Sequence, residues 1–315
     1  MKTNTPLNPI TTFHPSPLIL LLVALLTLGG CSRQYTNASG TNIGGTLAPT
    51  NSPSTLIAST PQNGTAIPMT PSAITDEPDC TTLGGQVVAA RIPSKNMQGD
   101  LSYHVYLPPC YDQNTTLRYP VLYLIHGQTF NDDQWVRLGV PQIMDKLIAE
   151  GNPPFIIVMP YDKYHYRQPA TDPFDEAVID ELIPIIDVRY RTIPNRTSRA
   201  VGGLSRGGGW ALHFALTHPE LFSAFGGHSL AILDEDGTHL SRMLDAIPPD
   251  EMPRMYMDIG KSDGLRASAE KFETQLTERG IPHEWYINPG YHDEAYWSKH
   301  VEEYLKWYAS GWVGE

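Results

Sequence analysis

The chain has few cysteines, few basic residues and only one long apolar run. Three cysteines in 315 residues exclude a scaffold held by many disulfides and a zinc or iron–sulfur site built from several cysteines. Lys and Arg together number 22 against 34 Asp and Glu, which gives a formal net charge of −12. Binding to nucleic acid requires clustered basic side chains, so no nucleic-acid partner is predicted.

The long apolar run covers residues 18–28, near the N-terminus. A helix needs about 20 residues to span a bilayer, so the run is too short for this role but matches the apolar region of a signal peptide. It ends at Gly29, Gly30 and Cys31, and this ending resembles the lipobox of bacterial lipoproteins. Residues 1–30 are therefore predicted to be a lipoprotein-type signal peptide, with lipidation at Cys31. A plain secretory signal with a coincidental cysteine is the alternative.

Residues 31–79 are predicted to be a flexible tether. The segment 34–75 contains no Asp, Glu, Lys or Arg and is dominated by Thr, Asn, Ser, Gly and Pro. Such a segment buries too little apolar surface to offset the entropy lost on ordering. Lipobox and tether together predict an exported protein that contacts the bacterial cell membrane only through its N-terminal lipid anchor, on the extracytoplasmic side.

The other two cysteines, Cys80 and Cys110, lie in the remainder of the chain. An exported protein meets an oxidising compartment, so the pair is predicted to form a disulfide that closes a loop of about thirty residues. Two buried free thiols are the alternative.

Residues 80–315 show the alternating strands and helices of one three-layer α/β domain. Residues 120–125 and 155–159 are continuous apolar runs, typical of central parallel strands that are covered on both faces. Residues 101–107 alternate polar and apolar side chains, as in a half-exposed antiparallel strand. Other strands are predicted at 86–92, 198–204, 224–227, 255–259 and 283–287, and helices at 140–150, 177–188, 207–217, 267–279 and 294–307.

The segment 203–207, Gly-Leu-Ser-Arg-Gly, fits the pattern G-x-S-x-G with Ser205 at its centre. A predicted strand leads into it and a predicted helix leads out, which is the context of a nucleophile elbow. Ser205 would then lie at a helix N-terminus, where free N–H groups and the helix dipole favour developing negative charge. A glycine-rich turn with a capping serine is the alternative, and the context favours a nucleophile.

A serine nucleophile needs a base and a carboxylate that orients the base. His292 is the predicted base because its loop lies between the last predicted strand and the last helix. Asp263 is the predicted carboxylate because it follows the strand at 255–259, with Asp258 as the alternative.

An oxyanion hole needs two backbone N–H groups directed at the tetrahedral intermediate. One is assigned to Arg206, the residue after the nucleophile. The other is assigned to Gln128, in the loop that follows the strand at 120–125. Trp135, Tyr161 and Tyr291 are predicted to bind substrate through their aromatic side chains. They are chosen from a wider set of aromatic candidates that also contains Tyr164, Tyr166, Tyr296 and Trp297.

These motifs together resemble the esterase D type family of α/β-hydrolases, which includes S-formylglutathione hydrolases, feruloyl and acetylxylan esterases, enterochelin esterases and mycolyl transferases. The resemblance covers residues 86–307. Its carriers are Y-L-P-P-C-Y-D (106–112), Y-P-V-L-Y-L-I-H-G (119–127), R-A-V-G-G-L-S-R-G-G (199–208), D-I-G-K-S-D (258–263) and P-G-Y-H-D-E-A-Y-W (289–297). It implies an α/β-hydrolase fold with a mostly parallel sheet of roughly eight or nine strands. It also assigns Ser205, Asp263 and His292 as the triad.

The sequence therefore predicts an extracytoplasmic serine carboxylic-ester hydrolase that forms an acyl-enzyme with a small-molecule or carbohydrate ester. An acyl transferase with an alcohol acceptor is one alternative. A non-catalytic cell-surface binding protein is another. Neither a metal nor a cofactor is predicted, because the chain lacks H-E-x-x-H and its histidines show no ligand spacing.

Overall fold

An eight-stranded sheet runs through the computed structural model, which describes Cys80 and residues 83–313. The predicted signal peptide, the lipidation site Cys31 and the predicted tether lie outside the described residues. Between Cys80 and Val313, no described helix is both long and apolar enough to cross a membrane.

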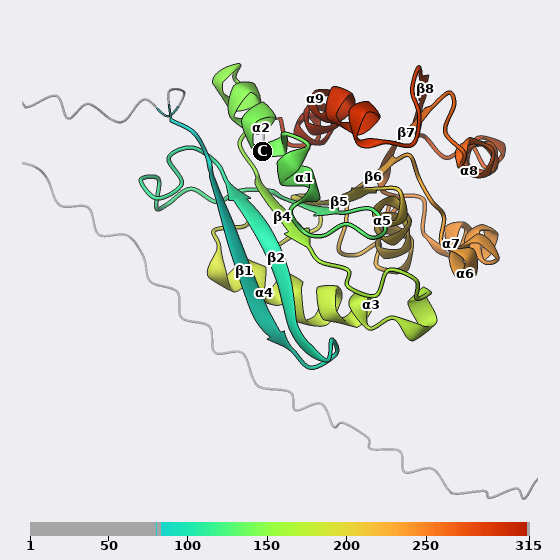
Figure 1. The fold of residues 1–315 in the computed structure, drawn as a ribbon, viewed down its shortest axis with the longest axis horizontal. Coiled ribbons are helices and arrows are strands. Elements are labelled where there is room, and N and C mark those ends of the chain that lie inside the picture. Colours follow the sequence, from blue (N-terminus) through green and yellow to red (C-terminus); the bar gives the residue numbers. More distant parts are fainter. Residues whose placement is uncertain (1–79, 81–82, 314–315) are drawn as a thin grey trace, which may run out of the picture. The chain divides into compact units, whose positions relative to one another are not determined.

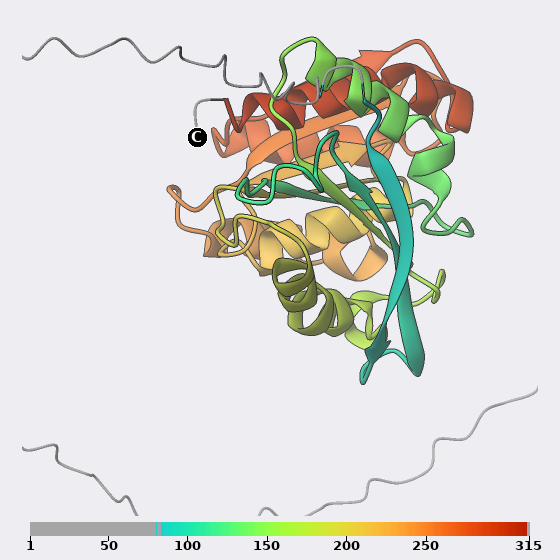
Figure 2. The ribbon, with the colours of Figure 1, turned by 90° about the vertical axis from the view of Figure 1, so that its left-hand side faces the viewer.

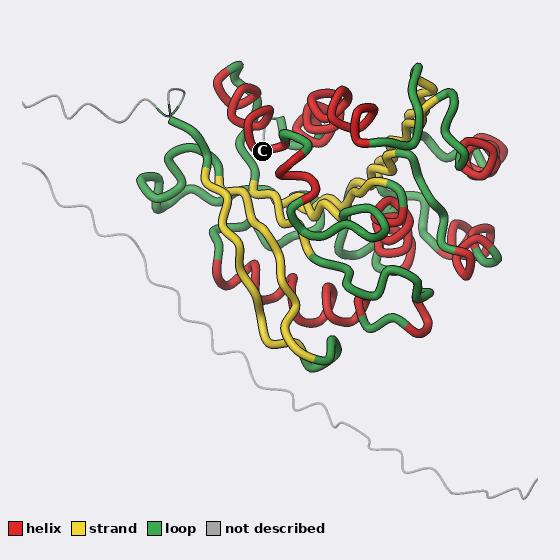
Figure 3. The backbone as a smooth tube through the Cα atoms, in the orientation of Figure 1, coloured by secondary structure: helices red, strands yellow, loops and turns green. Residues whose placement is uncertain are grey.

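The sheet is mostly parallel, as the family resemblance implied. Its strands are β1 (Gln86–Ser94), β2 (Gly99–Leu107), β3 (Val121–Ile125), β4 (Ile156–Pro160), β5 (Arg199–Leu204), β6 (Ala224–His228), β7 (Arg254–Gly260) and β8 (Glu284–Asn288). Their spatial order is β1-β2-β4-β3-β5-β6-β7-β8. Figure 3 shows the strands in yellow, running as one sheet through the middle of the fold. Strands β3 to β8 pair in parallel, and β2 runs antiparallel to both β1 and β4. The predicted α/β-hydrolase architecture is confirmed.

Helices cover both faces of this sheet, which gives the three predicted layers (Figures 1 and 2). They are α1 (Gln134–Arg137), α2 (Val140–Ala149), α3 (Phe174–Glu176), α4 (Ile183–Arg189), α5 (Arg206–Thr217), α6 (Asp234–Gly237), α7 (Leu240–Ala246), α8 (Arg266–Glu278) and α9 (Glu294–Ser310). Apolar side chains of α1, α2 and α9 pack on one face, and those of α4, α5, α7 and α8 pack on the other. Each face therefore has its own core.

The central strand β3 shows why its sequence is a continuous apolar run. Leu122 and Leu124 pack in the core beneath α2 and α9. Val121, Tyr123 and Ile125 pack in the core on the opposite face. Successive side chains of a strand point to opposite faces, so a strand that is covered on both sides must be apolar throughout.

The helix predicted at 177–188 is interrupted and begins again next to Pro184. Proline has no backbone N–H, so it is tolerated in the first turn of a helix but not in its interior. A π-helical segment, Ala177–Leu182, ends at this point, and Pro184 occupies the first turn of α4. The short helices α1, α3, α6 and α7 were not predicted, because three to seven residues carry too little periodicity to be recognised.

The predicted disulfide joins Cys80 to Cys110, whose Cα atoms lie 5.5 Å apart. Cys110 belongs to the loop that follows β2. The bridge therefore ties the chain before β1 to the loop after β2, at the open end of the hairpin where Gln86 pairs with Leu107.

Candidate active site

Ser205 occupies a sharp turn between β5 and α5. Its φ and ψ angles are 54° and −123°, a conformation that costs energy for a residue with a Cβ and is typical of functional sites. Glycines make the turn possible. A Cβ at Gly203 would overlap the backbone of Gly207, and a Cβ at Gly207 would overlap the carbonyl oxygens that follow β3. The strand, the turn and the helix thus have the geometry predicted from the G-x-S-x-G pattern.

His292 lies between Ser205 and Asp263. Its Nε2 is 2.9 Å from Ser205 Oγ, and its Nδ1 is 2.8 Å from Asp263 Oδ2. The three side chains follow β5, β7 and β8, and parallel strands end at the same edge of a sheet. The Asp263 side chain is fully buried, whereas 31% of the His292 side chain is exposed. An imidazole in this position can accept the serine proton while the carboxylate stabilises its charged form.

Backbone hydrogen bonds fix the loops that carry His292 and Asp263. The amide of Lys261 donates to the carbonyl of Asn288 over 2.7 Å, and the amide of Ser262 donates to the carbonyl of Gly290 over 2.9 Å. These bonds extend the pairing of β7 with β8 beyond the ends of the strands. The distance between imidazole and carboxylate is therefore set by the sheet itself.

Asp263 is held in its ionised form. Burial alone would raise its pKa. Hydrogen bonds from His292 and from the backbone N–H of Leu265 outweigh that effect and hold the pKa of Asp263 below its ordinary value. A carboxylate that stays charged can stabilise an imidazolium throughout the neutral range.

Asp258, the alternative carboxylate, lies in β7 and takes part in a different network. Its Oδ1 is 2.9 Å from Nδ1 of His228, and its Oδ2 accepts hydrogen bonds from the hydroxyls of Tyr296 and Tyr304 over 2.6 and 2.8 Å. All of these side chains are buried. Asp258 therefore anchors α9 to the sheet and makes no hydrogen bond with His292.

In the loop after β3, the backbone N–H of Gln128 has no hydrogen-bond partner among the described residues. The amide of Gly127 donates to Oε1 of Gln134 over 2.8 Å, whereas the amide of Gln128 donates to none of the other described residues. His126 steadies this loop, because its Nε2 accepts the amide N–H of Asp162 over 2.9 Å. Burial lowers the pKa of His126, which favours the neutral ring that such an acceptor requires.

A cavity of about 510 Å³ opens above Ser205 and His292. Aromatic, apolar and acidic side chains line it together. Its lining residues are Gly127, Gln128, Thr129, Phe130, Tyr166, Leu204, Ser205, His292, Asp293, Glu294 and Trp297. A small molecule that enters this cavity can therefore reach the serine hydroxyl and the imidazole.

The sequence was compared with those of known protein families to find the family to which it belongs. The sequence profile of a family described as "Putative esterase" matches residues 94–310, more than half of the chain. The chain belongs to the putative esterase family. This confirms the family resemblance seen in the sequence motifs.

Two curated relatives of this family member are enzymes by name. An endo-1,4-beta-xylanase/feruloyl esterase of Xylanibacter ruminicola is 32% identical over 202 residues, which cover 58% of this chain and 27% of the relative. Esterase Rv1288 of Mycobacterium tuberculosis is 26% identical over 243 residues, which cover 60% of this chain and 52% of the relative. The chain thus spans about a quarter to a half of the length of these relatives.

Solved structures show the same fold. A ferulic acid esterase superimposes with a TM-score of 0.66 at 26% identity, and the match covers 72% of this chain and 98% of that one. An S-formylglutathione hydrolase of Staphylococcus aureus superimposes with a TM-score of 0.60 at 17% identity, covering 72% and 100%. At that lower identity, the second match bears on the fold alone.

The three aromatic residues predicted to bind substrate occupy different positions in this putative esterase. Trp135 is 1% exposed and donates from Nε1 to the carbonyl of Ile125, so it is placed as a core residue. Tyr161 packs against the His126 ring at 5.5 Å between centroids. Tyr291 is 65% exposed beside His292. None of the three lines the cavity above Ser205.

Other aromatic side chains line that cavity instead: Phe130, Tyr166 and Trp297. Trp297 packs edge-on against the His292 ring at 5.0 Å between centroids. Tyr166 and Trp297 belong to the wider set of aromatic candidates in the sequence, whereas Phe130 does not. Phe130 follows Gln128 by two residues, which was a weak signal for it.

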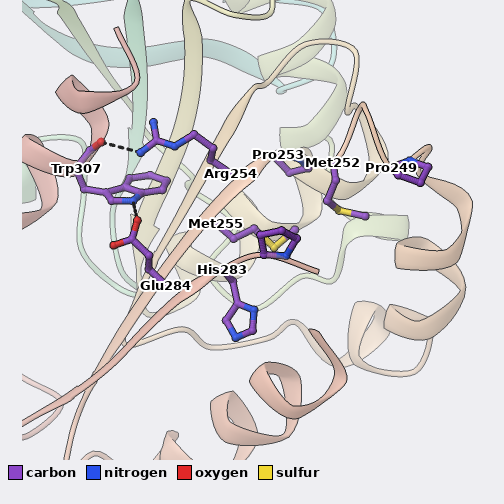
Figure 4. A pocket seen from close by; sticks show the side chains of 9 residues that line it. Pro249, Met252, Pro253, Arg254, Met255, His283, Glu284 and Trp307 are labelled. Atoms are coloured by element: carbon purple, nitrogen blue, oxygen red, sulfur yellow. Dashed lines mark hydrogen bonds between the residues drawn. The ribbon is translucent and has the colours of Figure 1, made fainter. Parts of the chain in front are cut away.

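A separate cavity of about 370 Å³ lies at the opposite ends of the strands (Figure 4). It is formed where β7 and β8 begin, and Arg254, Glu284 and Trp307 meet there. Trp307 donates from Nε1 to Glu284, and Arg254 donates to the carbonyl of Trp307. The charged groups of this cavity are bonded to their own surroundings, and it is remote from the edge that carries Ser205. Between Leu83 and Val313, and at Cys80, no group of three His, Cys, Asp or Glu side chains could hold a metal ion.

Proposed function

We propose that the protein is a serine carboxylic-ester hydrolase with Ser205 as nucleophile, His292 as general base and Asp263 as the orienting carboxylate. The observation that carries the proposal is the continuous pair of hydrogen bonds from Ser205 Oγ through His292 to Asp263, at 2.9 and 2.8 Å. Ser205 attacks the ester carbonyl while His292 takes its proton. His292 then returns the proton to the leaving alcohol, and water releases the acyl group from the enzyme.

The backbone N–H groups of Gln128 and Arg206 stabilise the oxyanion. The amide of Gln128 supports this role because it has no partner among the described residues. Arg206 is the first residue of α5, where backbone amides have no acceptor within the helix. No side-chain chemistry is required of either residue, because backbone donors suffice.

We propose small aryl or carbohydrate esters as substrates. The named feruloyl esterase relative supports this class, as does a cavity whose walls combine aromatic rings with carboxylates. Aromatic rings pack against aryl groups and sugar faces, and carboxylates accept hydrogen bonds from hydroxyls.

Hydrolysis of p-nitrophenyl acetate by the Ser205→Ala variant tests the proposal. We expect turnover to fall by at least about 10³-fold, because loss of the nucleophile removes the covalent pathway. Ser268→Ala, on α8, is the matched control and should keep wild-type turnover. A fluorophosphonate probe should label the wild type and the control, and not Ser205→Ala. Undiminished turnover by Ser205→Ala would overturn the assignment.

We also propose that the mature protein is exported and carries a lipid on Cys31. The support is the apolar run that ends at Cys31 and the uncharged polar segment behind it. The full chain is expressed in a bacterial host, and partition between a detergent phase and an aqueous phase measures whether it carries a lipid. The wild type should enter the detergent phase and Cys31→Ser should remain in the aqueous phase. Equal partition of the two would overturn the anchor.

A further inference from the structure

Two hollows flank the wall formed by Gln128 and Tyr166. The larger is the cavity of about 510 Å³ that contains Ser205 and His292. The smaller, of about 290 Å³, is lined by Gln128, His165, Tyr166, Gln168, Arg206, Ala231, Ile232, Leu233 and Asp234. It adjoins both residues assigned to the oxyanion hole. His292 does not line it.

This arrangement distinguishes the two halves of an ester. When the Ser205 Oγ–acyl bond forms and the acyl–alkoxy bond breaks, His292 delivers its proton to the leaving oxygen. The leaving group must therefore lie beside His292, in the larger cavity. The acyl group is attached to the same carbon, on the side away from the leaving oxygen.

The walls of the larger cavity carry negative charge and no positive charge. Asp293 and Glu294 line it, and no Lys or Arg does. Asp293 caps α9, because its Oδ1 accepts the amide N–H of Tyr296 over 2.9 Å, and its Oδ2 bonds to none of the described residues. Glu294 is partly compensated by Arg137 at 3.1 Å, a guanidinium that also bonds to Asp133 at 2.9 Å.

Trp297, which also lines this cavity, has a buried hydrogen-bond donor without a partner in the described part of the chain. Its side chain is only 3% exposed, and its indole Nε1 has no hydrogen-bond partner among the residues that the structure describes. A buried N–H without a partner is costly. An ordered water, or a hydrogen-bond acceptor on a molecule bound in the cavity, would satisfy the group.

We infer that Asp293 and Glu294 form an acidic lip that selects uncharged leaving groups over anionic ones. The inference rests on the proposed esterase function and adds to it the side of the site that the alcohol occupies. Asp293 contributes most of the selectivity, because its charge has no cationic partner. Arg137 acts in the opposite sense, since it offsets the charge of Glu294.

Two acetyl esters of equal shape test the acidic lip. They are 3-acetoxybenzamide, with a neutral leaving group, and 3-acetoxybenzoate, with an anionic one. The ratio of their kcat/KM values is measured for the wild type, Asp293→Asn, Arg137→Gln and Glu302→Gln. Asparagine keeps the capping oxygen. Glu302 lies on α9, pairs with Lys146 and lies outside the cavity lining, so its substitution controls for net charge.

We expect the wild type to prefer the neutral ester by about tenfold at low salt, because the cavity is open and water screens most of the repulsion between the two charges. Asp293→Asn should lower the ratio to about threefold, Arg137→Gln should raise it, and Glu302→Gln should leave it unchanged. High salt should bring every ratio toward one.

A charge placed on the acyl half tests whether the effect belongs to the leaving group. Monophenyl succinate and its uncharged succinamate analogue share phenol as leaving group, so Asp293→Asn should change their ratio much less. Equal changes in both pairs of esters, or a wild-type ratio of one for the benzoate pair, would overturn the inference. Because each ratio compares active enzymes, these outcomes leave the esterase assignment intact, whereas absence of turnover on all four esters would reject the proposed function itself.

Discussion

The guanidinium of Arg206 donates from Nε to Oδ2 of Asp162 over 2.9 Å, and both side chains are buried. The same guanidinium donates from Nη2 to the carbonyl oxygens of Tyr164 and Arg167 and lies 3.3 Å from Asp172. The residue after the nucleophile thus ties the start of α5 to the loop that follows β4. That loop carries Tyr166, which borders both hollows of the site.

Replacing Arg206 by Met should destabilise the fold. The substitution leaves the Asp162 and Asp172 carboxylates buried without their shared cation, a change that costs about 3–5 kcal/mol when a buried ion pair loses one partner. Urea unfolding measures the loss. Arg266→Met is the matched control, because Arg266 forms an exposed pair with Glu270 on α8 and should cost less than about 1 kcal/mol. Equal costs for the two variants would contradict a structural role for the buried pair.

Asp172 should make the fold less stable as the pH rises. Burial and the neighbouring Asp162 carboxylate raise the pKa of Asp172 to about 7, although Arg206 and the N–H of Phe174 oppose the shift. Between pH 4 and pH 7 the folded state then holds a proton that the unfolded chain has released. Stability therefore falls with rising pH in that window and changes little above it. The wild type should lose about 2 kcal/mol relative to Asp172→Asn between pH 5 and pH 8.

Chemical denaturation of both proteins at several pH values checks this difference. Asparagine cannot ionise, so it removes the titration and keeps the size of the side chain. A stability difference between wild type and Asp172→Asn that stays constant from pH 5 to pH 8 would show that Asp172 does not titrate in this range.

Gly207 should not tolerate a methyl group, because a Cβ there would overlap the carbonyl oxygens of Ile125 and His126. Gly207→Ala should separate α5 from β3 and remove most activity, with a stability loss of more than about 2 kcal/mol. Gly264→Ala is the control, since no atom lies within 4 Å of a Cβ at that position. It should change stability by less than about 0.5 kcal/mol. Esterase assays with thermal unfolding of both variants measure the contrast.

The relative positions of Ser205, Asp263 and His292 could be predicted because each sits directly after a strand. Parallel strands bring such loops to one edge whatever the residues between them, so order along the chain was sufficient. The choice of Asp263 over Asp258 followed from the same rule, since Asp258 lies inside β7. Apolar runs also identified the central strands, because burial on both faces removes polar positions.

The side chains around these three residues were harder to predict. The sequence gives the type of an aromatic residue but not the surface that its side chain faces. Residue type alone therefore could not distinguish Trp135, which lies in the core, from Trp297, which lines the cavity. The burial of the Arg206 side chain depends on Asp162 and Asp172, which lie more than thirty residues away in a different loop. Contacts of this kind are set by the packing of separate loops and have no local signal.

Substitution of Asp263 should mainly lower kcat, whereas substitution of Asp258 should mainly lower the stability of the fold. Asp263→Asn keeps the shape of the side chain but removes the charge that stabilises an imidazolium, so kcat should fall on the order of 10²–10⁴-fold while the free energy of unfolding changes little. Asp258→Asn removes an acceptor that His228, Tyr296 and Tyr304 share in the core. It should destabilise the fold by about 2–4 kcal/mol and reduce kcat far less at temperatures where the protein stays folded. Paired measurements of kcat and unfolding on both variants test the assignment. A greater loss of kcat for Asp258→Asn than for Asp263→Asn would reverse the roles of the two aspartates.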